Sequence, residues 1–161
     1  MIVVTNSGPL IALARIGRLE LLHALFGKLC VPPAVREEVV ASGHGRPGAK
    51  EIGAADWVET VHVRDRTAVQ LLHDRLAMGE SQALVLAIEM KADLLLMDEA
   101  RGRRIAEARG LNVSGTIGVL VAAKRRRLIP AVTPVLDQLL AAGFRMSEDL
   151  YQTGQRLANE I

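Results

Sequence analysis

Two apolar runs of four residues, Ile2–Thr5 and Leu94–Met97, constrain the fold of this chain most strongly. Each run is too short for a helix of its own, and such short β-branched or aliphatic runs favour buried strands. Helical patterns lie between the runs, and strands that alternate with helices form parallel sheets covered on both faces. The sequence therefore predicts an α/β fold: a three-layer α/β/α arrangement around a short central parallel sheet.

The remaining pattern divides the chain into further strands, helices and one loop. Additional strands are expected at Leu29–Val31, at Val58–Val63 as a half-exposed edge strand, and at Asn112–Val113. Helices are expected over 7–14, 19–26, 33–41, 66–76, 80–91 and 99–108, with three more after them, and residues 42–48 form a loop. A length of 161 residues suits a single domain, 1–161, that includes C-terminal helices over about 130–161.

Composition excludes several classes of function. Twenty basic residues nearly balance eighteen acidic ones, so net charge does not mark a general nucleic-acid binder. Two Phe, one Trp and one Tyr are too few for an extended base-stacking platform. The single Cys30 excludes an intrachain disulfide and a thiolate zinc cage. Without an apolar run of about 18 residues or a signal-peptide pattern, we expect a cytoplasmic protein that does not enter the membrane.

Polar residues follow two of the expected strands. Asn6 comes directly after Ile2–Thr5, and Asp98 comes directly after Leu94–Met97. Parallel sheets bind ligands beyond the carboxyl ends of their strands, which makes both residues candidates for a site. The alternatives are that Asp98 caps the following helix and that Asn6 is an ordinary turn residue.

Glu80 lies at the start of an expected helix, on the face that carries the apolar residues. The stripe that shares its face lies three, four, seven and eight residues later, at Ala83, Leu84, Ala87 and Ile88. An inward carboxylate costs free energy unless it is paired or binds a cation. The alternative is a first-turn glutamate that the helix dipole favours, which explains its place in the sequence but not its face.

Two further carboxylates, Glu37 and Glu38, lie on the helix after Pro33. At roughly 100° per residue, Glu38 falls about 60° from Val35, beside the apolar stripe of that helix. Glu37 points further away. Glu38 is therefore the better candidate for a site, and Glu37 is expected to face solvent, although a surface role for Glu38 also fits.

Three stretches together resemble the PIN-domain superfamily, and in particular its prokaryotic branch related to VapC-type toxins. They are Val4–Ile11 (VTNSGPLI), Val31–Val39 (VPPAVREEV), and Gly79–Ala83 (GESQA) leading to Leu95–Arg103 (LLMDEARGR). Their order and spacing cover roughly residues 2 to 125.

This resemblance implies a ribonuclease that cleaves RNA phosphodiesters with Mg²⁺ or Mn²⁺, which prefer the hard oxygen ligands that carboxylates supply. The implied site is Asn6, Glu38, Glu80 and Asp98, with Ser7 and Glu99 as accessory neighbours. Glu80 and Asp98 would be primary ligands, Asn6 a neutral oxygen ligand, and Glu38 a carboxylate for a second metal or a water. The family usually has Asp where this chain has Asn6, and often a hydroxyl residue at Gly8. A small antitoxin and a homodimer are the implied partners.

Local positive charge offers contacts for RNA phosphates. Arg101 and Arg103 follow Asp98 closely, and Lys124–Arg127 form a second cluster, so both are candidates. The alternative for both is a solvated helix face or cations that offset a helix dipole, and it is favoured for Lys124–Arg127. The competing functions are a metal-dependent ribonuclease and a PIN-like RNA- or protein-binding module weakened by Asn6. A generic nucleotide-binding domain has no support, because the sequence contains neither GxGxxG nor a phosphate loop.

Overall fold

The computed structural model describes residues 1–41, 45–46 and 48–161. Five strands form one sheet in the order β3-β2-β1-β4-β5, and each neighbouring pair is parallel. The strands are β1 (Val3–Thr5), β2 (Leu29–Val31), β3 (Val58–Thr60), β4 (Leu94–Leu96) and β5 (Val113–Ser114). The predicted parallel α/β/α fold is confirmed.

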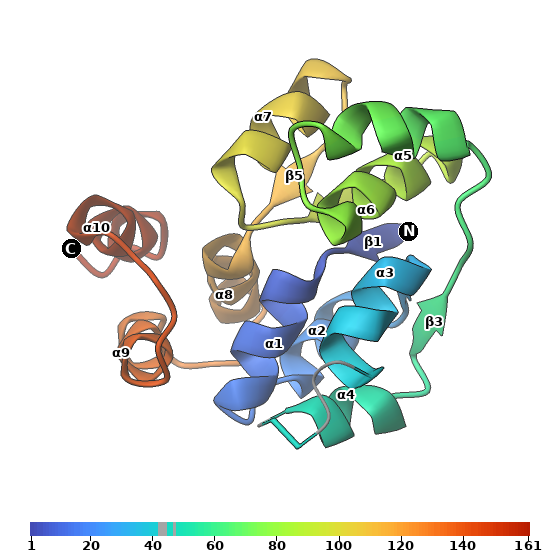
Figure 1. Ribbon diagram of the computed structural model, residues 1–161. Helices are drawn as coiled ribbons and strands as arrows, with labels where there is room; N and C mark the ends of the chain where they lie inside the picture. Colours follow the sequence, from blue (N-terminus) through green and yellow to red (C-terminus); the bar gives the residue numbers. More distant parts are fainter. Residues whose placement is uncertain (42–44, 47) are drawn as a thin grey trace.

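Helices cover both faces of the sheet. They are α1 (Ser7–Arg15), α2 (Glu20–Phe26), α3 (Pro33–Arg36), α4 (Ala49–Ala54), α5 (Arg66–His73), α6 (Met78–Glu89), α7 (Ala100–Ala108), α8 (Thr116–Arg125), α9 (Thr133–Ala141) and α10 (Glu148–Leu157). Figure 1 shows α5, α6 and α7 on one side of β1, with α1, α2 and α4 on the other. None of the helices in the described part of the chain is long and apolar enough to cross a membrane.

Three local predictions were incomplete. The edge strand ends at Thr60 rather than Val63, because its partner β2 is only three residues long and its pairing with β3 ends there. The helix over 33–41 divides into α3 and a π-helical segment, η1 (Glu37–Ala41). Helix α4 was not foreseen, since it is short and contains a glycine. Within the loop expected over 42–48, residues 42–44 and 47 lie outside the described residues.

The pairing of β1 with β4 fixes where the strand ends meet. Thr5 lies opposite Leu96 in the register, and the Asn6 backbone N–H donates to the Leu96 carbonyl at 2.9 Å. From β1 the chain continues toward β2 on one side, whereas β4 continues to β5 on the other. Such a divergence leaves a crevice at the carboxyl edge, where α/β proteins bind ligands.

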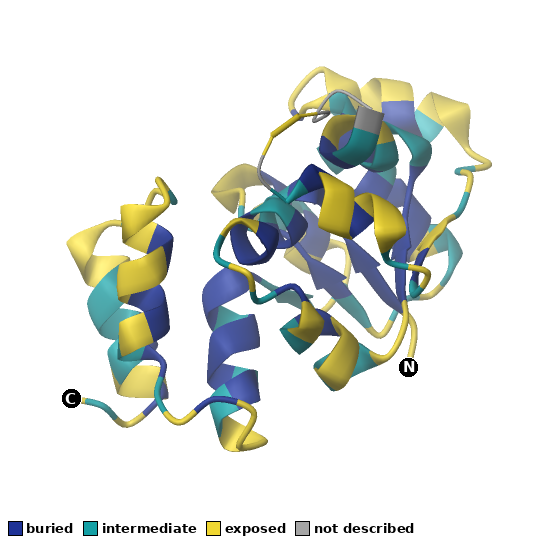
Figure 2. Ribbon diagram, turned by 90° about the horizontal axis from the view of Figure 1, so that it is seen from below, coloured by how far each residue is buried: buried dark blue, intermediate teal, exposed yellow. Residues whose placement is uncertain are grey.

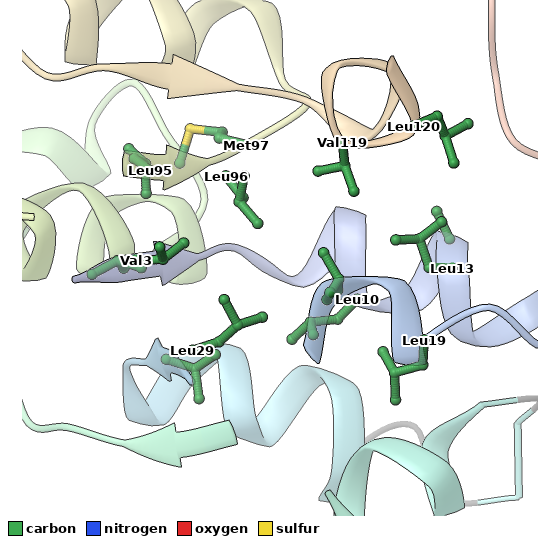
Figure 3. Close-up of a cluster of buried hydrophobic side chains, with 14 of the residues drawn as sticks. Val3, Leu10, Leu13, Leu19, Leu29, Leu95, Leu96, Met97, Val119 and Leu120 are labelled. Atoms are coloured by element: carbon green, nitrogen blue, oxygen red, sulfur yellow. The ribbon is translucent and has the colours of Figure 1, made fainter. Parts of the chain in front are cut away.

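A continuous apolar core holds this edge in place. Figure 3 shows buried side chains of β1, β2 and β4 gathered with those of α1 and α8, among them Val3, Leu29, Leu96, Leu10 and Leu120. All five are buried, and each such side chain contributes about 1.5–3 kcal/mol on burial. The buried side of α8 runs along its length in Figure 2.

The chain ends in a polar latch around Glu160. Its carboxylate accepts hydrogen bonds from the Val132 and Thr133 backbone N–H groups, from the Thr133 hydroxyl and from Lys124 Nζ. Burial alone would raise the pKa of Glu160, but these hydrogen bonds lower it to about 2. The latch joins the C-terminus to α8 and to the start of α9.

We predict that Glu160→Gln lowers the free energy of unfolding at pH 7 by about 1–2 kcal/mol, since it removes charge-assisted hydrogen bonds. The folded pKa lies below the ordinary 4.5, so this contribution is present above pH 4.5 and is lost as the pH falls toward 2. Urea unfolding of both proteins at pH 7 and pH 3 measures it. If the difference in unfolding free energy between wild type and Glu160→Gln is no smaller at pH 3 than at pH 7, the proposed role of Glu160 is wrong. Glu107→Gln, which changes an exposed carboxylate, is the control.

Candidate functional site

Asn6 is buried at the carboxyl end of β1, with 7% of its surface exposed. It occupies the N-cap position of α1, yet its side chain makes no capping hydrogen bond. The third residue of that helix is Pro9, which has no N–H to offer a cap. Asn6 Oδ1 therefore remains buried without a hydrogen-bond partner, so the side chain is not an ordinary helix cap.

Asp98, at the carboxyl end of β4, is held by the first residue of α8. The Thr116 backbone N–H donates to Asp98 Oδ1 and the Thr116 hydroxyl donates to Oδ2, both at 2.7 Å. The N-cap of α7 is Glu99 rather than Asp98. The carboxylate thus faces a helix N-terminus, which favours its negative charge, and its remaining lone pairs stay available.

Glu80 lies in the first turn of α6 and has one satisfied and one unsatisfied oxygen. The Ala77 backbone N–H donates to the carboxylate, whereas Oε2 is buried without a partner. Burial raises the pKa of Glu80, the Glu99 and Glu38 carboxylates raise it further, and the bond from Ala77 opposes them. Glu80 therefore lies in the first turn of its helix, as one interpretation held, and also turns one carboxylate oxygen into the protein interior, as the other held.

Most of the helix face that carries Glu80 is buried, as the sequence pattern predicts. Ala83, Leu84 and Ala87 have no more than 1% of their surface exposed, whereas Ile88 is 44% exposed. The stripe therefore ends one residue earlier than expected, near the end of α6 that lies away from the site.

Glu38 extends toward the same edge from η1. Its Oε2 accepts a hydrogen bond from the Ser7 hydroxyl at 2.9 Å, which links it to the start of α1. A methyl group added at Gly79 would lie 2.0 Å from Glu38 Oε1, so the carboxylate lies directly over the first turn of α6. Glu38 lies in the π-helical segment η1, and such segments are frequent at functional sites. Glu37 is exposed.

Two glycines allow the other carboxylates to approach their neighbours. A methyl group at Gly8 would lie 3.2 Å from Asp98 Oδ2, and one at Gly102 would lie 3.5 Å from Glu80 Oε2. Gly8 therefore gives Asp98 room beside α1.

The donor set suits a hard divalent cation such as Mg²⁺ or Mn²⁺. It combines carboxylate oxygens with an amide oxygen, and the unpartnered atoms are Asn6 Oδ1 and Glu80 Oε2. No three His, Cys, Asp or Glu side chains within residues 1–41, 45–46 and 48–161 form a metal cage by themselves. The amide oxygen of Asn6 is a further candidate donor, because it is buried without a hydrogen-bond partner.

The arginines that follow Asp98 differ in where they lie. Arg103 Nη1 and Asp98 Oδ1 would both lie within 2.8 Å of a methyl group added at Gly115, so Arg103 belongs to the edge of the site. Arg101 Nη1 donates instead to the Arg75 carbonyl at 3.3 Å. Within the second basic cluster, Lys124 serves the C-terminal latch and Arg126 donates to the Leu25 carbonyl.

Sequence reasoning missed Thr116, which orients Asp98. A signal was present, because Ser114 lies opposite Leu96 in the sheet and Gly115-Thr116 follows that last strand. The rule that singled out Asn6 and Asp98 therefore also applies to the residues after β5. The rule could not be applied there from the sequence, because the two-residue pattern Asn112–Val113 does not show where the strand ends.

Comparisons with known proteins agree with this fold. The family model DUF3368, described as a PIN domain, matches residues 2–160. A PilT N-terminus domain protein from the hyperthermophilic archaeon Sulfolobus solfataricus P2 has a similar structure, with a TM-score of 0.50 and 15% identity. The similarity covers 92% of this chain and 98% of that one, and at this identity it supports the fold alone. A search of curated proteins finds no match. The chain belongs to the PIN-domain family.

Proposed function

We infer that this protein is a metal-dependent ribonuclease whose site is the carboxyl edge formed by Asn6, Glu38, Glu80 and Asp98. The observation that carries the proposal is the pair of buried, unpartnered oxygens, Asn6 Oδ1 and Glu80 Oε2, at the edge where Asp98 also lies. Leaving such atoms without a partner costs free energy, which a bound cation would offset.

Each side chain has a defined task in this proposal. Asn6, Glu80 and Asp98 hold a Mg²⁺ or Mn²⁺ ion, and Thr116 keeps Asp98 oriented toward it. When bound, the ion neutralises phosphate charge and lowers the pKa of a water. Glu38, held by Ser7, is placed to orient that water or to support a second ion. Arg103 supplies positive charge for the phosphate beside Asp98.

A second function is favoured by one observation, the amide at position 6 in place of the family's usual carboxylate. Asn6 supplies an oxygen but no negative charge, which weakens attraction for a cation. A PIN fold that binds RNA or protein without cleaving it is therefore the alternative.

The toxin role extends the first proposal. It rests on the resemblance of the three sequence stretches to VapC-type toxins. In this role the protein forms a homodimer, and a small antitoxin protein covers the acidic edge. The role also includes an intracellular RNA target.

The first test is cleavage of a labelled single-stranded RNA pool in Mn²⁺ and in Mg²⁺ by wild type, Asp98→Ala and Asn6→Asp. Wild type should cleave, and Asp98→Ala should lose at least about 100-fold in rate, since even outer-shell changes at metal sites cost 10–100-fold. Asn6→Asp should lower the half-saturating Mn²⁺ concentration about tenfold, which corresponds to about 1.4 kcal/mol.

Glu107→Ala is the matched control, because it removes an exposed carboxylate near the far end of α7. Activity in Asn6→Asp alone would favour the binding module as the natural function. Silence in all variants, with folds intact by circular dichroism, would overturn the ribonuclease proposal.

A second prediction concerns stability without metal. In EDTA at pH 7, Glu80→Gln should melt a few degrees above wild type, since about 1 kcal/mol corresponds to roughly 2–4 °C for a chain of this size. The reason is that burial and the Glu99 and Glu38 carboxylates raise the pKa of Glu80 above its ordinary 4.5. Wild-type stability relative to Glu80→Gln should therefore fall as the pH rises past 4.5.

Glu89→Gln provides the contrast on the same helix. The Glu89 carboxylate accepts backbone hydrogen bonds from Arg64 and Asp65, so its neutralisation should lower the Tm. Mn²⁺ should raise the Tm of wild type and of Glu89→Gln, but raise that of Glu80→Gln much less. A lower Tm for Glu80→Gln than for wild type in EDTA would mean that Glu80 serves the helix rather than a cation.

A further inference from the structure

A pocket of about 380 Å³ opens beside the acidic edge, between α1 and the segment that follows α9. Asp98 and Glu99 line one end of it, and Gly8 and Ile11 contribute from α1. Phe144 and Arg145 line it from the segment between α9 and α10. This volume lies within the range of small-ligand sites.

The wall that carries Phe144 is fixed by the end of α9. Gly143 has a φ of +94°, the Phe144 N–H donates to the Leu139 carbonyl, and the Gly143 N–H donates to the Leu140 carbonyl. These are the two hydrogen bonds of a Schellman motif, which turns the chain sharply at a helix end. Leu139 and Phe144 therefore form one rigid apolar surface of the pocket.

Two arginines add positive charge to this apolar pocket. Arg15, in the last turn of α1, and Arg145 both line it and both are exposed. In the described part of the chain, no hydrogen bond or ion pair engages either guanidinium. Their charges are therefore free to meet an anion at the mouth of the pocket.

We propose that this pocket binds one nucleotide of a single-stranded RNA, with its base against Phe144 and its flanking phosphates near Arg15 and Arg145. The proposal rests on the ribonuclease function above, because it places the neighbouring phosphodiester at the acidic edge by Asp98. A single aromatic ring suits a single unstacked base, and proteins recognise single-stranded RNA through such splayed bases.

The composition of the pocket favours a nucleotide over an acidic peptide. A peptide carboxylate would meet the same arginines, but it would offer no planar group to Phe144. A nucleotide offers an apolar face and an anion at separate positions, as the pocket does.

The test is fluorescence anisotropy in EDTA, which measures binding in the absence of cleavage. The probes are a labelled octauridylate and an octamer with the same ribose-phosphate backbone but no bases. Phe144→Leu, which keeps apolar volume, should weaken octauridylate binding at least about fivefold and leave the abasic octamer unchanged. Arg15→Ala and Arg145→Ala should weaken both probes, and each should reduce the logarithmic salt slope by about 0.7.

Arg125→Ala is the matched control, since Arg125 is exposed at the end of α8 opposite Thr116. Equal binding by wild type, Phe144→Leu and both pocket arginine variants, or no binding by wild type, would overturn the inference. Competition by a decaglutamate that is as strong as by unlabelled octauridylate would also overturn it, in favour of an acidic protein segment. Because cleavage is measured separately in Mn²⁺, pocket-dependent binding without cleavage would count against the ribonuclease and not against the pocket.

Discussion

The pairing of β1 with β4 is the constraint on which the site depends. Because these two short strands are parallel and adjacent, their carboxyl ends lie at the same edge, with Thr5 opposite Leu96. Asn6 and Asp98 are the next polar residues on each strand, although 92 positions separate them in the sequence. Val3, Val4, Leu95 and Leu96 of these strands are buried, so a shift of the register would also expose core side chains.

The acidic edge is built at a cost to stability. Burial and two neighbouring carboxylates oppose the charge of Glu80, and a buried amide oxygen of Asn6 lacks a partner. Functional sites commonly carry such local destabilisation. By contrast, several donors surround the partly buried carboxylate of Glu160 in the C-terminal latch. This contrast supports the proposal that the acidic edge binds a ligand.

The sequence predicted the fold well because its strongest signals were local. Short β-branched and aliphatic runs, with proline and glycine between them, predict the order of strands and helices, and the right order of α/β elements implies a parallel sheet. The boundaries of β3 and the division of the helix after Pro33 depend on tertiary partners, so they could not be derived from local pattern.

The candidate site was harder to predict than the fold. Strand ends and the helical face of Glu80 singled out three residues, whereas the positions of Thr116, Arg103 and Phe144 depend on contacts between segments far apart in sequence. Arg101 is closer to Asp98 in the sequence than Arg103 is, yet Arg103 Nη1 lies beside Asp98 Oδ1, whereas Arg101 donates to the Arg75 carbonyl.

The most direct test of the central claim is a crystal structure of the wild-type protein soaked in Mn²⁺, with anomalous scattering data. We predict an anomalous peak in direct contact with Asn6 Oδ1, Glu80 Oε2 and the Asp98 carboxylate. A well-ordered site without a peak, or Mn²⁺ bound only elsewhere, would contradict it.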